Sequence, residues 1–114
     1  MQPEELEVLE EQLDDGTSRL VLRGELDLTG GPEVAARLQE LERAGRPVRL
    51  DLSGLTFMDS TGVGLLYMAS KRSRDGGPPL EIVRPTGEPW RVLEITGLHR
   101  VLPFVDGDGH RDGR

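Results

Sequence analysis

Cysteine is absent from this chain of 114 residues, and histidine is nearly so. Without cysteine the chain can form no disulfide bond, no cysteine-ligated zinc site and no thiol nucleophile. His99 and His110 are the only histidines, which excludes a metal site built from several histidines. We therefore expect neither a bound metal nor another cofactor.

Aromatic residues and basic charge are also scarce. The chain has two Phe, one Tyr and one Trp, too few to build a stacking platform for single-stranded nucleic acid. Its 14 Lys and Arg are outnumbered by 21 Asp and Glu, which leaves a formal net charge of −7. Because an acidic surface repels phosphate backbones, direct binding to nucleic acid is disfavoured. We expect a partner that is neutral or locally basic.

Long hydrophobic runs are missing as well. The longest apolar stretch, residues 62–69, is far shorter than the ~20 residues that cross a bilayer. The first twelve residues, MQPEELEVLEEQ, are acidic and do not resemble a signal peptide. These features predict a soluble cytoplasmic protein that does not insert into a membrane.

What the chain does have is aliphatic: 18 Leu, 9 Val and 2 Ile, enough for one core. Its length is typical of one domain, which we expect over residues 1–105. The last nine residues, DGDGHRDGR (106–114), contain nothing to bury, so we expect a disordered tail there.

Hydrophobic periodicity predicts the element order β-β-α-β-α-β-α-β. The expected strands are 5–13, 19–26, 48–52, 80–84 and 101–105. The expected helices run from Pro32 to a stop at Gly45, over roughly 60–74, and from Pro89 to a cap at Gly97. Strands joined by single helices require right-handed crossovers and a largely parallel sheet. The turn at residues 14–17 adds an antiparallel hairpin, so the sequence predicts a mixed α/β sheet.

The most informative segment is DLSGLTFMDSTGVGLL (51–66). A strand is followed by an apolar loop, and Asp59, Ser60 and Thr61 then lead into a helix whose first N–H groups are unpaired. These residue types are the preferred helix caps, and composition alone favours that structural role. A hydroxyl presented there for modification or contact is the second interpretation, and the two are compatible.

Three segments together resemble the STAS domain, the fold of bacterial anti-sigma factor antagonists. VRLDLSGLTFMDSTGVGLL (48–66) is similar to the family signature, and VLRGELDLTGGPEV (21–34) and EPWRVLEITGLHRVLPFVD (88–106) are similar to its flanking elements. The resemblance covers about 100 residues in the right order and spacing. It implies a STAS-like mixed β-sheet with helices.

The resemblance also implies a function and a site. Ser60 matches the phosphorylated serine, Asp59 the acidic residue before it, and Asp27 the acidic residue that ends the second strand. The implied partner-binding residues are Asp27, Asp59, Ser60, Thr61, Gly62 and Val63. Unphosphorylated members bind an anti-sigma factor, typically also an ATP-dependent serine kinase, and free its sigma factor. Phosphorylation of the serine abolishes binding and a phosphatase resets it. Such a protein is not an enzyme.

Two departures from the family pattern have consequences. Thr61 stands beside Ser60 and is a second candidate phosphate acceptor. The family usually has a helix after the last strand, and with the Asp/Gly/Arg-rich residues 106–114 in that place we expect it to be absent or to form poorly. This predicts a less covered surface near Leu98, Leu102 and Phe104 and a tendency to self-associate. The oligomeric state stays open.

Two other functions remain as alternatives. The chain is either a STAS subunit of another assembly, such as a stress-signalling complex or a transporter's partner, or a small hydrolase or phosphotransfer enzyme using Ser60 or Asp51. A phosphoacceptor Asp51 needs a cluster of further acids to bind Mg²⁺ and a lysine after a later strand. The chain offers Asp27 as a lone acid, and in place of the lysine the nearest basic residue is Arg84. A serine hydrolase needs a Gly-x-Ser-x-Gly turn, which is lacking around Ser60. We expect His99 to be a surface turn residue and Trp90 to pack.

Overall fold

The computed structural model describes residues 5–106, which form a five-stranded sheet, three α-helices and one 3-10 turn. The strands are β1 (Glu7–Gln12), β2 (Ser18–Leu26), β3 (Val48–Met58), β4 (Leu80–Val83) and β5 (Phe104–Val105). The helices are α1 (Gly31–Arg43), α2 (Ser60–Arg74) and α3 (Gly87–Thr96), followed by the 3-10 turn η1 (Leu98–Arg100). The predicted order of strands and α-helices is confirmed.

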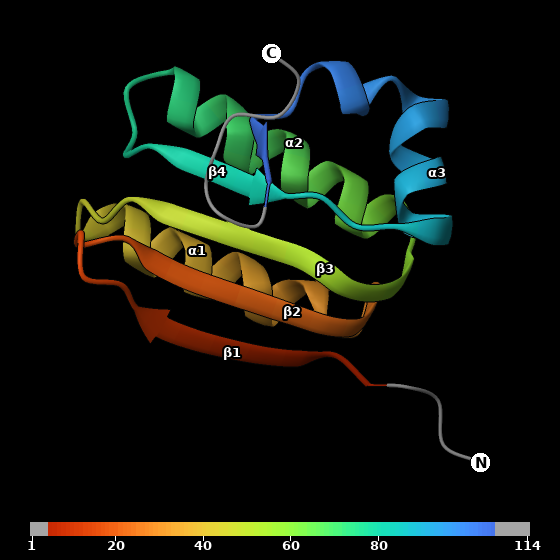
Figure 1. Ribbon diagram of the computed structural model, residues 1–114, viewed down its shortest axis with the longest axis horizontal. Coiled ribbons are helices and arrows are strands. Elements are labelled where there is room, and N and C mark those ends of the chain that lie inside the picture. The colour runs from red at the N-terminus through yellow and green to blue at the C-terminus, as the bar shows by residue number, and fades with distance from the viewer. Residues whose placement is uncertain (1–4, 107–114) are drawn as a thin grey trace.

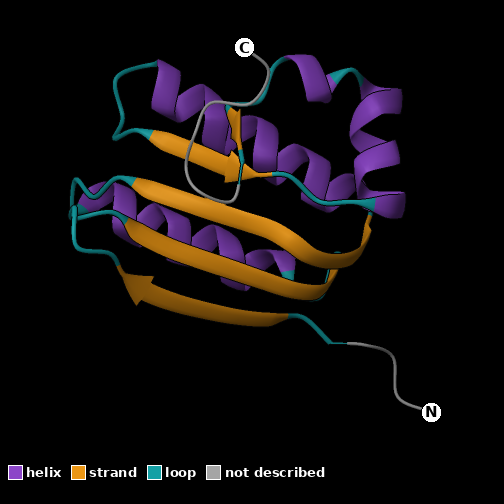
Figure 2. Ribbon diagram, viewed as in Figure 1, coloured by secondary structure: helices purple, strands orange, loops and turns teal. Residues whose placement is uncertain are grey.

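The strands lie in the order β1-β2-β3-β4-β5 (Figures 1 and 2). β1 runs antiparallel to β2 across the predicted hairpin, and the remaining neighbours are parallel. Each parallel pair is joined through a helix or a helix and turn, as the alternation of periods in the sequence requires. The mixed α/β sheet is therefore confirmed.

The core lies between the sheet and the helices. α1 and α2 lie behind the strands in the view of Figure 1, and α3 stands at one end of the sheet. Leu20 from β2, Leu50 from β3, Leu66 from α2 and Leu93 from α3 each have 0% exposure and belong to one hydrophobic cluster. The aliphatic composition thus supplies a single continuous core over the described residues.

Strand β3 is longer than predicted. It continues through the expected loop as far as Met58, because Leu55 and Met58 are buried and pair along β2. The register between β2 and β3 shifts twice, once on each side of Gly24, whose φ is +102°. These irregularities interrupt the alternation of buried and exposed side chains. The sequence pattern therefore predicted a loop where the chain in fact remains an extended strand.

The last part of the chain differs from the prediction in its bounds. α3 begins at Gly87, two residues before Pro89, because a proline in the first turn removes no helical hydrogen bond. It ends as expected at Gly97, which has a left-handed φ of +81°. The final strand covers only Phe104–Val105, because η1 occupies the residues just after Gly97.

The predicted uncovered surface near the last strand is wrong. Leu102 and Phe104 are each only 6% exposed. Trp90 packs edge-on against Phe104, with 5.3 Å between ring centroids. The Trp90 ring thus covers Phe104, where a further helix was expected to be needed. The expected packing role of Trp90 is confirmed. His99 is half-buried rather than a plain surface residue, and its ring meets Trp90 at 6.1 Å.

The expected tail falls, from residue 107 onward, outside the described residues, as do residues 1–4. Within residues 5–106, no helix has both the length and the apolar character needed to cross a membrane.

Candidate functional site

The carboxyl ends of β2 and β3 meet at one edge of the sheet. Leu26 pairs with Met58, and the amide of Asp59 donates to the Leu26 carbonyl at 3.3 Å. Asp27 follows Leu26 directly, so the structure brings the two predicted acidic residues, Asp27 and Asp59, to neighbouring positions. This edge is where open α/β sheets usually place their functional side chains.

The cap of α2 is Asp59. Its backbone is extended, and its Oδ1 accepts the Thr61 amide at 2.8 Å. Ser60 is the first helical residue and is exposed. The Ser60 hydroxyl makes no hydrogen bond with any residue in the range 5–106. Because Asp59 satisfies the orphan amide, the hydroxyl of Ser60 is left facing solvent.

Thr61 has different surroundings from its neighbour. It is half-buried, and its methyl group lies against Gly31 at the start of α1. A Cβ atom placed on Gly31 would stand 2.8 Å from Thr61 Cγ2, so only glycine admits this approach. Thr61 therefore packs the start of α2 against the start of α1.

Gly62 and Val63 face inward. Gly62 is buried, and an added Cβ would lie 2.5 Å from Met58 Cγ and 3.1 Å from Leu26 Cδ2. Val63 is half-buried and packs against the hydrophobic core. The missing side chain of Gly62 lets α2 begin close to the sheet. The predicted partner contact of Gly62 stays a prediction.

Asp27 shapes the loop that leads into α1. Its Oδ1 accepts the amides of Thr29 at 3.0 Å and Gly30 at 3.2 Å, and its carbonyl accepts the amide of Gly31 at 2.8 Å. These three bonds fix the path from β2 into the helix and hold the carboxylate beside the start of α1.

Negative charge gathers around Asp27. A hollow of about 400 Å³ beside it is lined by Glu25 at the end of β2, Glu33 in the first turn of α1, and Glu5. No group of three or more acidic or histidine side chains in residues 5–106 is arranged to hold a metal ion. The edge is thus an acidic surface next to Ser60.

An apolar hollow of about 500 Å³ lies on the other side of Ser60, between α1 and α2. We call it the α1–α2 groove. Its apolar lining consists of Leu28, Pro32, Ala35, Leu65 and Met68, and Ser60 and Thr61 also line it. Leu28 is 75% exposed and Met68 47%. The sequence analysis did not identify this groove; the only signal was that Leu65 and Met68 lie beside the buried stripe of α2.

Asp51 is a buried carboxylate that is hydrogen-bonded and ion-paired within the sheet. It lies inside β3, where the prediction had placed a strand end, and it is only 6% exposed. Burial acts to raise the pKa of its carboxyl, but hydrogen bonds from Ser53 Oγ and N and the Arg19 guanidinium at 2.8 Å hold the pKa below its ordinary value. Arg19 also pairs with Glu11. The carboxylate is thus the buried member of an ion-pair network whose other members, Arg19 and Glu11, are partly exposed.

In the hydrolase alternative His99 would be the base for Ser60, and the structure places His99 in η1. The Nδ1 atom of His99 is buried and has no hydrogen-bond partner among the described residues. Its ring packs against Trp90, which belongs to α3, and makes no hydrogen bond with Ser60. An activated serine requires such a bond to its base.

Comparisons with known proteins agree with this fold. A family model described as "Mlab, STAS domain" matches residues 9–104. The anti-sigma-B factor antagonist of Listeria monocytogenes is 30% identical over 95 residues, covering 82% of this chain and 83% of the relative.

Two solved structures share the fold. An anti-sigma factor antagonist from Mycobacterium paratuberculosis has a TM-score of 0.76 and 22% identity, covering 88% of this chain and 85% of that one. The Bacillus cell fate determinant SpoIIAA in its phosphorylated form has a TM-score of 0.69 and 21% identity, covering 90% and 94%. The chain belongs to the STAS domain family, the family of these anti-sigma factor antagonists.

Proposed function

We propose that this protein is an anti-sigma factor antagonist whose unphosphorylated form binds an anti-sigma factor and thereby frees a sigma factor. The observation that carries the proposal is Ser60: it begins α2 with an exposed, unbonded hydroxyl because Asp59 caps the helix. The names of the relatives support the same function, and SpoIIAA has been solved in a phosphorylated form. Such a role places the protein in the cytoplasm.

The anti-sigma factor in this proposal is also a serine kinase. Ser60 Oγ attacks the γ-phosphorus of ATP, a new O–P bond forms as the β–γ bridge breaks, ADP leaves, and a base of the kinase takes the hydroxyl proton. A phosphatase later hydrolyses the ester and restores Ser60. The protein itself acts as substrate and ligand and not as an enzyme.

Ser60 is a better phosphate acceptor than Thr61. Its hydroxyl is exposed at the very start of α2, whereas Thr61 is half-buried with its methyl group against Gly31. Thr61 is therefore less accessible to a kinase than Ser60. We therefore assign the modification to Ser60.

The switch is electrostatic. A phosphate adds a charge of about −1.5 to −2, and a helix N-terminus tolerates an anion, so the fold survives the modification. Asp59 and Asp27 already make this edge negative, so a partner suited to the unmodified surface is repelled. We expect little refolding and a loss of partner affinity.

The partner contacts both sides of Ser60. The α1–α2 groove gathers the exposed side chains of Leu28 and Met68 in one apolar hollow, and Ser60 itself lines that hollow. Asp27 and Glu33 lie on the other side. The complementary partner surface carries an apolar anchor for the groove and neutral side chains opposite Ser60, where a phosphate would be buried without a counter-charge.

A pull-down tests the proposal. The wild-type protein is used as bait for anti-sigma serine kinases from the same genome, with ADP or with ATP. We expect a kinase to bind with ADP and to be released with ATP, and Ser60→Ala to hold it under both conditions. If no such kinase binds, or if wild type and Ser60→Ala behave alike with ATP, the proposal fails.

A STAS subunit of another assembly is the second candidate, because the matching family model is described as "Mlab". The same pull-down separates the two functions. Stable capture of a partner without kinase activity, unaffected by ATP, supports the second candidate and contradicts the first.

A further inference from the structure

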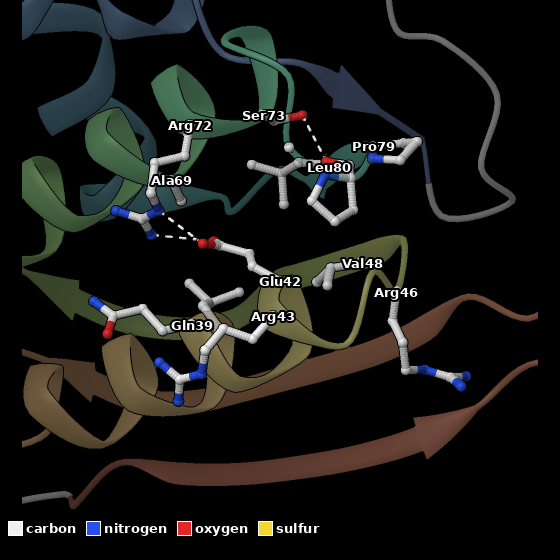
Figure 3. A pocket seen from close by; sticks show the side chains of 13 residues that line it. Gln39, Glu42, Arg43, Arg46, Val48, Ala69, Arg72, Ser73, Pro79 and Leu80 are labelled. Atoms are coloured by element: carbon white, nitrogen blue, oxygen red, sulfur yellow. Dashed lines mark hydrogen bonds and ion pairs between the residues drawn. The ribbon is translucent and has the colours of Figure 1, made fainter.

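A second hollow, of about 370 Å³, lies at the opposite end of α1 and α2 from Ser60. It is bounded by the last turns of both helices and by the starts of β3 and β4 (Figure 3). We call it the C-terminal pocket. Gln39 and Arg72 line both this pocket and the α1–α2 groove, so they separate the two hollows.

The interior of the C-terminal pocket is apolar and its wall is rigid. Leu38, Val48 and Ala69 reach it from the core, and Pro78, Pro79 and Leu80 form the outer wall. The wall is tied back to α2 by two bonds, from Gly77 N to the Arg72 carbonyl at 3.0 Å and from Ser73 Oγ to the Pro78 carbonyl at 2.9 Å. A ligand therefore enters a preformed site and does not have to order it.

The rim of the pocket is basic although the chain is acidic. Three arginines line it, Arg43, Arg46 and Arg72, against the single carboxylate of Glu42. Glu42 spans the gap between the helices and binds Arg72 through two bonds, 2.8 and 3.1 Å long (Figure 3). That carboxylate is thus already neutralised by one of the three.

The other two guanidinium groups keep their full charge. Arg46 donates only to neutral acceptors, including Ser18 Oγ and the Gly16 carbonyl, each at 2.9 Å. Arg43 ends α1, is exposed, and forms no ion pair with any carboxylate in residues 5–106. Figure 3 shows the Arg43 guanidinium beside Gln39, outside the apolar interior. Because no carboxylate in residues 5–106 holds it, the side chain can turn over the pocket mouth when an anion binds.

We infer that the C-terminal pocket binds a small amphipathic anion, a carboxylate with an apolar tail. The tail occupies the space between Leu38, Val48 and Leu80, and the carboxylate meets the guanidinium group of Arg43, since that of Arg72 is already paired with Glu42. The pocket lies near the lower end of the usual ligand range of ~300–1,000 Å³, which suits a tail of medium length. This site is separate from Ser60 and does not depend on the proposed partner.

Octanoate is the probe that tests the site. It is titrated into the ¹⁵N-labelled full chain, with 1-octanol and propionate as controls that keep only the tail or only the charged head. We expect saturable amide shifts centred on Ala69, Ser73 and Gly77, and at least ~10-fold weaker binding of either control (~1.4 kcal/mol). Unsaturable shifts, shifts centred elsewhere, or equal binding of 1-octanol would overturn the inference.

A pair of charge-reversal variants tests the role of the rim. Arg43→Glu is compared with Arg91→Glu, an exposed arginine of α3 that is not part of the pocket lining. Both change the net charge equally and both lie on the surface, so both should fold. We expect Arg43→Glu to weaken octanoate binding at least ~5-fold while Arg91→Glu leaves it unchanged. Equal effects from the two variants would contradict a specific anion site.

Discussion

Asp59 Oδ1 accepts the amide hydrogen of Thr61 at 2.8 Å, so Asp59 and not Ser60 provides the side-chain cap of α2. In a sequence of three potential cap residues, only one performs the capping. The serine is left exposed at a position where the helix dipole tolerates an anion. Capping by Asp59 and the proposed modification of Ser60 therefore fall on adjacent residues and do not compete.

This division of roles predicts unequal effects of two alanine substitutions. Asp59→Ala removes the cap and should lower the free energy of unfolding by about 1 kcal/mol. Ser60→Ala removes a solvent-facing hydroxyl and should change it by less than ~0.5 kcal/mol. Urea unfolding of the two variants measures both values. A loss at Ser60→Ala as large as that at Asp59→Ala would show that the serine is itself a structural cap.

Two glycines of α2 form a matched pair. An alanine at Gly62 would overlap Met58 and Leu26, whereas nothing lies within 4 Å of a Cβ placed on Gly64. Gly64→Ala should stabilise the protein by about 0.5–1 kcal/mol through helix propensity. Gly62→Ala should destabilise it by about 1–2 kcal/mol despite the same gain. Thermal or urea unfolding decides, and a stabilising Gly62→Ala would refute the tight contact between α2 and the sheet.

The proposed docking role of the α1–α2 groove predicts a selective effect on binding. Met68→Glu places a charge in the groove, and Ile95→Glu places the same charge on α3, where the isoleucine is 76% exposed. We expect Met68→Glu to weaken binding of the anti-sigma kinase at least ~10-fold (~1.4 kcal/mol) and Ile95→Glu to have little effect.

Calorimetric titration of the kinase with each variant provides the comparison. Circular dichroism and melting curves serve as controls for folding, because both positions are on the surface. Equal affinities for Met68→Glu and wild type would remove the groove from the proposed interface.

The buried carboxylate of Asp51 predicts a pH-dependent stability difference. Its pKa in the folded protein lies below the ordinary value of ~3.9 that applies when the chain is unfolded. Its contribution is therefore complete above about pH 4–5 and is lost as the pH falls through the folded pKa. Asp51→Asn should cost about 1–3 kcal/mol at pH 7, and this cost should shrink below pH 4.

Urea unfolding of wild type and Asp51→Asn at pH 7 and pH 3 makes the comparison. Asp14→Asn, an exposed residue of the β1–β2 turn, is the control and should have little effect at either pH. A cost of Asp51→Asn that is the same at both pH values would mean that its charge does not matter.

Local patterns were sufficient for the elements that obey a single period. The predicted range of about 60–74 for α2 agrees with Ser60–Arg74, because a cap residue precedes a regular helical stripe. The β2 pattern was equally clear, with Leu20, Leu22 and Leu26 all buried. The predicted range of β3 was too short because the bulges around Gly24 shift its pairing with β2. A search for strict alternation along the sequence does not detect such a shift.

The surroundings of the site depend on contacts between distant segments. The contact of Thr61 with Gly31 is made between two helices. The groove with Leu28 and Met68 likewise exists only because α1 lies beside α2. Tyr67 shows the same limit: its helical spacing from Val63 predicts a place on the buried face of α2, but it is 39% exposed. Sequence periodicity indicates which face is apolar, but not how far a neighbouring helix covers it.

The central claim is that phosphorylation of Ser60 switches off binding of an anti-sigma factor, and one measurement tests it most directly. The protein is incubated with the anti-sigma kinase and ATP, the modified residue is located by mass spectrometry, and the affinity of the kinase is then measured for the modified protein and for Ser60→Asp. We predict one phosphate on Ser60, none on Thr61, and affinities at least ~10-fold below that of the unmodified protein, with unchanged circular dichroism. A phosphate on another residue, or undiminished affinity once Ser60 carries it, would contradict the claim.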